Sequence, residues 1–160
     1  MKKETILQKS WIWNKSVNDF VKDRVVGYSL NVCAGENKIG DVKIDLDPKD
    51  RSIIKADMKN LPFPDETFDT VISDPPWKIG YYDRWKPFLE CVRVCKVGGK
   101  IIYNAYWLPW SKQVELKETF IRQDSPFANT SVISIFKRTR NTNEETLPLE
   151  SIHKSNPLNS

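Results

Sequence analysis

The sequence predicts an α/β fold, a mostly parallel β-sheet closed at one edge by an antiparallel hairpin. Short apolar segments with strand patterns recur along the first hundred residues, and two segments with helical spacing lie among them. Two longer alternating segments follow, and residues typical of a turn separate them. We therefore expect one domain over residues 1–138 and a weakly structured polar tail over residues 139–160.

The first half of the chain is expected to contain one helix and several short strands. Residues 10–26 place apolar side chains at helical spacing, which predicts an amphipathic helix. Residues 41–47 alternate, so that Val42, Ile44 and Leu46 would lie on one side of a strand. Further apolar strands are expected at residues 28–34, 52–56 and 68–73.

The second half is expected to contain a helix, a buried strand and the hairpin. Residues 82–94 have helical spacing, with Leu89 among the apolar positions. The Gly98-Gly99 pair is expected to interrupt the chain before a strand over residues 100–104. The two hairpin strands are expected at residues 114–122 and 130–138.

Composition and length exclude several classes of protein. A chain of 160 residues is long enough for one hydrophobic core and too short for a second. We expect no membrane segment, because no apolar run approaches the roughly 18 residues that a spanning helix requires. The charged N-terminus does not resemble a signal peptide, so the expected location is the cytoplasm.

The residues that most often bind metals or form nucleophilic triads are scarce. The single histidine, His153, lies in the polar tail, so we expect neither a Ser-His-Asp triad nor a histidine-ligated zinc. The three cysteines, Cys33, Cys91 and Cys95, have no C-x-x-C spacing, and packing explains the latter two. We therefore expect no metal site.

The charge is weakly basic, with 25 basic and 21 acidic residues giving a net charge of +4. This excess permits a polyanionic partner without requiring one. The basic residues Lys137, Arg138 and Arg140 form either a solvated strand end or a phosphate contact.

The most specific motif is Asp74-Pro75-Pro76-Trp77, directly after the expected strand 68–73. Each proline sets its own φ and restricts the residue before it, so the turn is rigid. The carboxylate of Asp74 and the carbonyl of Pro75 can both accept hydrogen bonds from an NH₂ group, which would fix the direction of the nitrogen lone pair for a reaction. Trp77 can stack on a planar base. These four residues are the candidate catalytic motif.

This motif resembles that of the amino-methyltransferases that modify adenine N6 or cytosine N4, in the form D-P-P-W. The resemblance implies a Rossmann-like fold and the cofactor S-adenosylmethionine. A first glycine motif over residues 31–37, which includes Cys33, Ala34 and Gly35, is similar to the segment that meets the methionine part of the cofactor. The resemblance to this superfamily spans about residues 30–106.

Other cofactor contacts implied by the resemblance follow the second and third strands. Asp45 matches the acidic residue that bridges both ribose hydroxyls, and Asp47 is its rival. Asp57 and Met58 lie in a segment similar to A-D-x-x-x-L-P-F, in which the aspartate accepts from the adenine amino group. The implied cofactor contacts are Cys33, Ala34, Gly35, Asp45, Asp57, Met58 and Asp74.

The chain departs from the family pattern in the length of its early connections. Residues 34–42 and 47–53 leave no room for the helices that normally join the first three strands, although parallel neighbours usually need a dozen or more residues. The fold is therefore expected to be shortened, with the first crossover helices reduced or missing. We expect the sheet face that they would leave exposed to be buried in a homodimer or against a partner subunit.

Aromatic residues near the motif are candidates for substrate binding. Trp77, Tyr81, Trp107 and Trp110 are the candidates, and for Trp107 and Trp110 core packing is an equal alternative.

The expected function is methyl transfer to an amino nitrogen of a DNA or RNA base, so a nucleic acid is the expected partner. The alternatives are methylation of a small molecule or a protein amide, and a non-catalytic partner subunit with the same fold.

Overall fold

The computed structural model describes residues 13–122 and 130–140, and shows a single mixed sheet with one helix on each side. Within these residues the sheet has seven strands in the order β3-β2-β1-β4-β5-β7-β6. The strands β1 to β5 run parallel, and β7 pairs antiparallel with both β5 and β6. The elements are α1 (Lys15–Lys22), β1 (Ser29–Val32), β2 (Val42–Asp45), β3 (Ile54–Lys55), β4 (Phe68–Ser73), α2 (Trp85–Val94), β5 (Cys95–Ala105), β6 (Val114–Arg122) and β7 (Ser131–Arg138).

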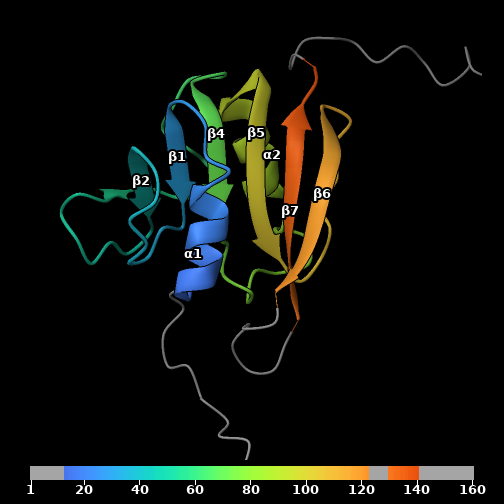
Figure 1. Cartoon of the computed structure of the whole chain (residues 1–160). Helices are drawn as coiled ribbons and strands as arrows, with labels where there is room; N and C mark the ends of the chain where they lie inside the picture. Colours follow the sequence, from blue (N-terminus) through green and yellow to red (C-terminus); the bar gives the residue numbers. More distant parts are fainter. Residues whose placement is uncertain (1–12, 123–129, 141–160) are drawn as a thin grey trace, which may run out of the picture.

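The mostly parallel sheet with a C-terminal hairpin confirms the predicted fold class. Figure 1 shows α1 in front of the sheet and α2 behind it. The larger core cluster lies on the α2 side, where Phe88 and Val92 of the helix pack with Val71 and Ile101 of the central strands. The smaller cluster lies on the α1 side and contains Trp13, Val21, Ile72, Ile102 and Ile133.

The helix α1 is shorter than the predicted segment 10–26. Asn14 ends it on the N-terminal side, because its side-chain oxygen accepts a hydrogen bond from the backbone N–H of Val17 at 2.9 Å. The helix stops at Lys22, and Gly27 then adopts a φ of +65° in the turn toward β1. Residues 10–12 of the predicted helix, the predicted turn 123–129 and residues 141–160 of the predicted tail lie outside the described residues.

The early connections are short, as predicted. The segments 33–41 and 46–53, which join β1 to β2 and β2 to β3, contain no helix, and neither does the segment 56–67. Gly40 allows the first of these connections to turn closely, with a φ of +102° that side chains other than glycine rarely adopt. Within the described residues, α2 is therefore the helix that connects two parallel strands, β4 and β5.

The prediction of an exposed apolar face over β1 and β2 is wrong. Leu30 and Ile44 are fully buried on the α2 side, where Leu61 of the segment before β4 packs against them. On the α1 side the residues are polar and bind the 33–41 connection: Ser29 Oγ donates to Asp41 at 2.7 Å, and the Asn31 amide donates to a backbone carbonyl at 3.0 Å. Short loops and polar side chains thus replace the missing helices. The partner subunit stays a prediction, but an exposed apolar face no longer supports it.

Two apolar positions are more exposed than predicted. Leu46 is 66% exposed, because β2 ends at Asp45 and the Asp45 carboxylate accepts the N–H of Asp47 in a turn. Leu89 is 47% exposed, because α2 buries the stripe formed by Phe88 and Val92 and leaves Leu89 at its edge. α2 also begins at Trp85 rather than at residue 82.

The predicted break at Gly98-Gly99 lies inside a strand. β5 begins at Cys95 directly after α2, and its pairing with β4 shifts register between Phe68 and Thr70. A Cβ on Gly99 would lie 2.9 Å from the backbone oxygen of Asp69, so the close approach of the two strands requires glycine. The two glycines produce an irregularity in the ladder instead of ending it.

The hairpin strands β6 and β7 match the prediction closely, but the basic residue at their end has a different role. The Arg138 side chain is fully buried, so it is neither solvated nor a phosphate contact. Its guanidinium donates to the backbone carbonyls of Arg93, at 2.9 Å, and of Cys95. It also lies 3.4 Å from Glu66. Arg138 therefore ties the end of β7 to the junction between α2 and β5.

Candidate functional site

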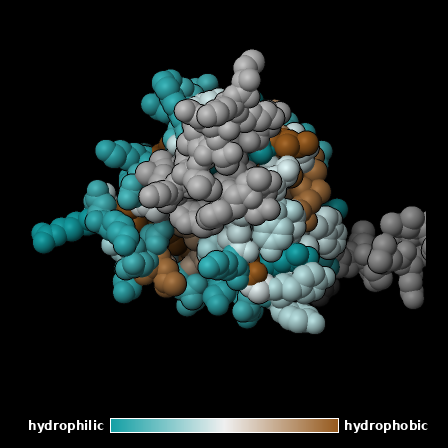
Figure 2. Space-filling model, turned by 90° about the horizontal axis from the view of Figure 1, so that it is seen from below, coloured by the Kyte–Doolittle hydropathy of each residue, from teal (hydrophilic) through white to brown (hydrophobic). Residues whose placement is uncertain are grey.

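A cavity of about 710 Å³ opens where the parallel strands β1, β2 and β4 end. This is the edge at which open α/β sheets bind their ligands, and the volume is that of a small-molecule site. Figure 2 views this edge of the molecule, and its described surface is mainly hydrophilic with smaller hydrophobic areas. The lining residues are Trp13, Asn31, Cys33, Ala34, Gly35, Glu36, Asn37, Asp45, Asp47, Lys49, Met58, Asp74, Pro75, Pro76, Trp77 and Lys78.

Asp74 follows the last residue of β4 and is held by two side chains from distant parts of the chain. The indole N–H of Trp13 donates to Asp74 Oδ2 at 2.6 Å, and the amide of Asn104 donates to Asp74 Oδ1 at 2.8 Å. Burial raises the pKa of the Asp74 carboxyl, while these two hydrogen bonds and the charge of Arg122 oppose that rise. Each oxygen of a carboxylate can accept a further hydrogen bond from the cavity side.

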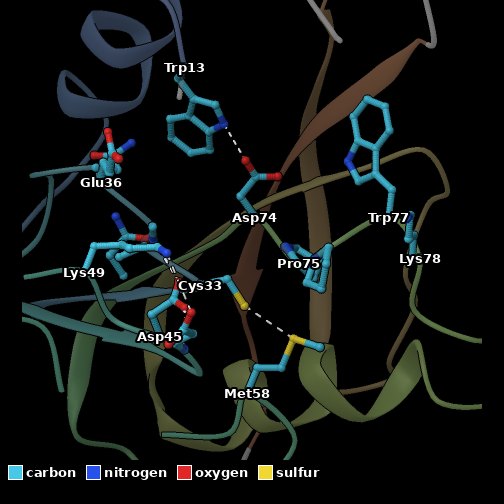
Figure 3. Close-up of a pocket in the computed structure, with 16 residues that line it drawn as sticks. Trp13, Cys33, Glu36, Asp45, Lys49, Met58, Asp74, Pro75, Trp77 and Lys78 are labelled. Atoms are coloured by element: carbon cyan, nitrogen blue, oxygen red, sulfur yellow. Dashed lines mark hydrogen bonds and ion pairs between the residues drawn. The ribbon is translucent and has the colours of Figure 1, made fainter. Parts of the chain in front are cut away.

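The rest of the motif forms one wall of the cavity. Pro75 is buried and Pro76 is exposed, as expected for a rigid turn that leaves the sheet. The Trp77 ring is partly exposed and lies edge-to-face with Tyr106, with ring centroids 6.5 Å apart. Figure 3 shows Asp74 between the indoles of Trp13, which precedes α1, and Trp77, which lies in the turn after β4.

The first glycine motif forms the opposite part of the cavity. Cys33 has a φ of +60°, which is a strained backbone conformation for a residue with a side chain and is often found at functional sites. Gly35 has a φ of +54°, and its N–H donates to Asp45 Oδ2 at 2.9 Å. The Cys33 sulfur lies 3.3 Å from that of Met58, and burial raises the pKa of the Cys33 thiol.

Asp45 is held more firmly than its rival Asp47. One Asp45 oxygen accepts the Gly35 N–H, and the other accepts the Asp47 N–H at 3.0 Å, so the carboxylate has a defined orientation at the end of β2. The Asp47 side chain is 88% exposed and lies 3.8 Å from Lys49. Asp57 is exposed and does not line the cavity, and its carboxylate accepts the N–H of Lys59 at 2.8 Å.

The predicted substrate aromatics other than Trp77 lie outside the cavity lining. Trp107 packs between Trp85 and Tyr103, with centroid distances of 4.8 and 6.2 Å, on the α2 side of the core. Tyr81 is 66% exposed under the guanidinium of Arg84, at 4.1 Å. Trp110 is 70% exposed.

Sequence reasoning missed residues that contact the motif from other elements. Trp13 is 61 positions from Asp74, and no local pattern predicts a contact between them. Asn104 lies in β5, the strand beside β4, and a polar residue near the end of a buried apolar strand was a usable signal. The other missed lining residues are Lys49 and Lys78, whereas Asn31, Glu36 and Asn37 belong to the segment expected to carry the first glycine motif.

Over residues 13–122 and 130–140, no three histidine, cysteine or acidic side chains are grouped so that they could hold a metal ion. Within the same ranges, no helix has the length and apolar character that crossing a membrane requires.

Several solved structures share this fold at low sequence identity. One is the 1,6-didemethyltoxoflavin-N1-methyltransferase of Burkholderia thailandensis with bound S-adenosylhomocysteine, with a TM-score of 0.60 and 8% identity over 79% of this chain and 78% of that chain. The N-methyltransferase NodS of Bradyrhizobium japonicum gives a TM-score of 0.58 and 10% identity over 78% and 94%. A TehB-like S-adenosylmethionine-dependent methyltransferase of Corynebacterium glutamicum gives 0.58 and 14% over 76% and 86%.

The sequence comparisons give a family match but no curated relative. The comparison with curated proteins gives no match. The family described as "Methyltransferase domain" matches residues 23–103, which is half of the chain and contains both the first glycine motif and Asp74. The chain therefore belongs to the methyltransferase domain family and is a methyltransferase.

Proposed function

We propose that this enzyme methylates an amino nitrogen of a nucleic-acid base, adenine N6 or cytosine N4. The observation that carries the proposal is the position of Asp74-Pro75-Pro76-Trp77, which lines the same cavity as Gly35 and Asp45. An acceptor-rich, rigid turn beside a cofactor cavity suits a neutral NH₂ group that must be oriented. This supports the resemblance to the D-P-P-W amino-methyltransferases.

The residues that line the cavity fit S-adenosylmethionine. Gly35, at a positive φ, has open space where a Cβ would stand, which allows the backbone to approach a ligand. The oriented carboxylate of Asp45 would accept hydrogen bonds from the ribose hydroxyls. Cys33, Ala34 and Met58 would complete the contacts, whereas Asp57 would need to rotate toward the cavity to take part. Asp74 lines the same cavity, where its carboxylate would bind the acceptor amine.

The proposed role of the motif is to position the acceptor nitrogen. S-adenosylmethionine supplies a methyl group that its sulfonium already activates. The Asp74 carboxylate and the Pro75 carbonyl accept hydrogen bonds from the two N–H groups of the substrate amine, so the lone pair of the amine nitrogen is directed at that methyl group. Trp77 stacks on the base. The new N–C bond forms as the S–C bond breaks, and the nitrogen then releases its proton to Asp74 or to water.

A base that is held in this way must be unpaired. The amine lies on the pairing edge of both bases, so a duplex substrate would have to flip its base into the cavity. Single-stranded DNA or RNA is therefore the expected substrate. Tyr81 and Trp110, outside the cavity lining, and the exposed Lys78 of the lining are proposed to contact the rest of the strand.

A second candidate substrate is a small heteroaromatic amine. The specific observation in its favour is that the cavity lining is not basic: it contains two lysines, Lys49 and Lys78, and the acidic residues Glu36, Asp45, Asp47 and Asp74. A nucleic acid needs cationic contacts to its phosphates, and a small molecule does not.

The test is transfer of tritiated methyl groups from S-adenosylmethionine to single-stranded DNA, single-stranded RNA and their duplexes, followed by mass spectrometry of the nucleosides. We expect N6-methyladenine or N4-methylcytosine in a single-stranded substrate. Asp74→Ala is expected to abolish this transfer while changing cofactor affinity less than about threefold, since its role is to hold the amine. Asp19→Asn, an exposed acidic position on α1, is the matched control and should behave as the wild type.

Three results would contradict the proposal. Equal loss of transfer and of cofactor affinity in Asp74→Ala would place Asp74 in the cofactor site instead. Methylation of small heteroaromatic amines without any nucleic-acid product would favour the second candidate. Cofactor binding without transfer to any acceptor would indicate a non-catalytic subunit.

A further inference from the structure

The Asp74 carboxylate is bound from outside the sheet by a residue of the N-terminal segment. Trp13 Nε1 donates to Asp74 Oδ2 at 2.6 Å. The Trp13 side chain is buried and also lines the cavity, so its ring forms part of the wall beside the proposed position of the amine. Figure 3 shows the indole nitrogen directed at the carboxylate. The family match begins at residue 23, so Trp13 lies outside the matched region.

Trp13 is held in place by α1 and by the sheet. The side-chain amide of Asn18 donates to the Trp13 carbonyl at 2.7 Å, which fixes the backbone before the helix. The ring belongs to the apolar cluster on the α1 side, with Val21 from the helix and Ile72 from β4. Because Ile72 precedes Asp74 by two residues, the same strand end carries both the packing surface and the hydrogen-bond acceptor.

Asn104 binds the second oxygen of the same carboxylate. Its Nδ2 donates to Asp74 Oδ1 at 2.8 Å, and the Asn104 side chain is buried in β5. Two donors on separate oxygens define the plane of a carboxylate, whereas one donor leaves it free to rotate. Trp13 and Asn104 therefore fix the orientation of Asp74 before any substrate binds.

We propose that Trp13 is a positioning residue for the methyl transfer, holding the Asp74 carboxylate so that its remaining lone pairs face the acceptor amine. This inference rests on the proposed role of Asp74. Preorganised hydrogen bonds of this kind act in the transition state without further rearrangement, so their loss lowers turnover more than binding. Trp13 acts through Asp74 and needs no contact with the reacting atoms.

The charged and titratable groups around Asp74 determine how its pKa responds to loss of the Trp13 hydrogen bond. Arg122 from β6 favours the charged carboxylate, as do the hydrogen bonds from Trp13 and Asn104. Cys33 after β1 and Tyr103 in β5 also interact with it, and burial keeps both neutral by raising the pKa of each. Removing the Trp13 N–H takes away one of three opposing contributions, so the Asp74 pKa would rise further.

The experiment compares Trp13→Phe, which keeps an aromatic ring but has no N–H, with Val17→Ala, which loosens α1 against the same cluster without touching Asp74. The first readout needs no substrate. In a ¹⁵N spectrum of the wild type, the indole signal that is missing in Trp13→Phe belongs to Trp13. We expect this signal to shift as Asp74 titrates and to lose that titration in Asp74→Asn. The Asp74 carboxyl carbon should titrate at higher pH in Trp13→Phe and as in the wild type in Val17→Ala.

The second readout is methyl transfer to the single-stranded substrate. A hydrogen bond to a charged group of this kind corresponds to roughly a 10- to 100-fold effect, so kcat of Trp13→Phe should fall by that factor at neutral pH. Its KM for S-adenosylmethionine should change less than about twofold. The acidic limb of the pH profile should move to higher pH, because the ionised form of Asp74 is lost at a higher pH when its pKa is higher.

The inference is overturned if the Trp13 indole signal ignores Asp74→Asn, or if Trp13→Phe and Val17→Ala have the same Asp74 titration and the same kcat. The spectroscopic arm separates this failure from failure of the proposed function. If no nucleic acid is methylated while the indole signal follows Asp74, the positioning contact stands and the substrate class is wrong.

Discussion

The choice between Asp45 and Asp47 as the ribose ligand gives a sharp prediction about cofactor affinity. Asp45 ends β2 and accepts backbone N–H groups from Gly35 and Asp47, at 2.9 and 3.0 Å, so its carboxylate is oriented before the cofactor binds. Asp47 is 88% exposed and forms a loose ion pair with Lys49 at 3.8 Å. Both side chains line the cavity, so their positions do not by themselves separate them.

The expected magnitude follows from these contacts. A hydrogen bond to a charged group contributes about 1.5–3 kcal/mol, so loss of one or two ribose contacts in Asp45→Ala should cost about 2–4 kcal/mol, a 30- to 1000-fold rise in Kd. The variant also frees the Gly35 N–H from its partner, which loosens the glycine motif. An exposed ion pair contributes about 0–1 kcal/mol, so Asp47→Ala should raise Kd at most about fivefold.

Isothermal titration calorimetry with S-adenosylmethionine and S-adenosylhomocysteine measures both variants directly. One site per chain is expected for the wild type, and thermal unfolding of each variant without ligand serves as the control for folding. A larger loss of affinity in Asp47→Ala than in Asp45→Ala would refute the assignment. No binding by the wild type would show that the short loops do not hold the cofactor alone and that a partner is required.

Two further predictions concern stability. Arg138→Met should lower the free energy of unfolding in urea by about 2–4 kcal/mol, because the buried carbonyl of Cys95 loses the Arg138 hydrogen bond and the Arg93 carbonyl keeps only the hydrogen bond from the Glu66 N–H; a loss below about 0.5 kcal/mol would mean that water or a neighbour replaces the guanidinium. The Asp41 carboxylate accepts hydrogen bonds from the side-chain hydroxyl and the backbone N–H of Ser29, and these hydrogen bonds lower the Asp41 pKa. The charged Asp41 carboxylate therefore contributes to the free energy of unfolding above the Asp41 pKa of the unfolded chain, and this contribution is lost as the pH falls through the Asp41 pKa of the folded protein. Asp41→Asn should flatten the acid side of a plot of melting temperature against pH, and an unchanged slope there would show that Ser29 does not favour the charged form.

The sequence predicted the strand before Asp74-Pro75-Pro76-Trp77 and the turn after it well, because the signals for both are local. The strand over residues 68–73 is continuously apolar and ends at two prolines, so both its limits and the turn after it follow from neighbouring residues. The hairpin strands alternate over eight or nine residues, which left little ambiguity. The missing crossover helices followed from chain length alone.

Other features failed because local patterns do not record what a segment packs against. The exposed face expected over β1 and β2 is absent, since Ser29 and Asn31 bind the short connection and replace apolar packing with hydrogen bonds. The sequence indicated that Gly98 and Gly99 interrupt the chain before a strand, but β5 continues through them and pairs with β4 on both sides. The sequence indicated a surface charge at Arg138, but its side chain is buried and donates a hydrogen bond to a backbone carbonyl of α2.

The sequence by itself determined the order of the strands and helices, the position of Asp74-Pro75-Pro76-Trp77 after a buried strand, and the glycine and acidic residues that follow β1 and β2. Each of these depends on the conformational preferences of adjacent residues. Only the tertiary structure decided how the site is completed. Trp13 and Asn104 reach Asp74 across 61 and 30 positions of the chain, and a hydrogen bond between such distant residues forms only when packing brings their elements together.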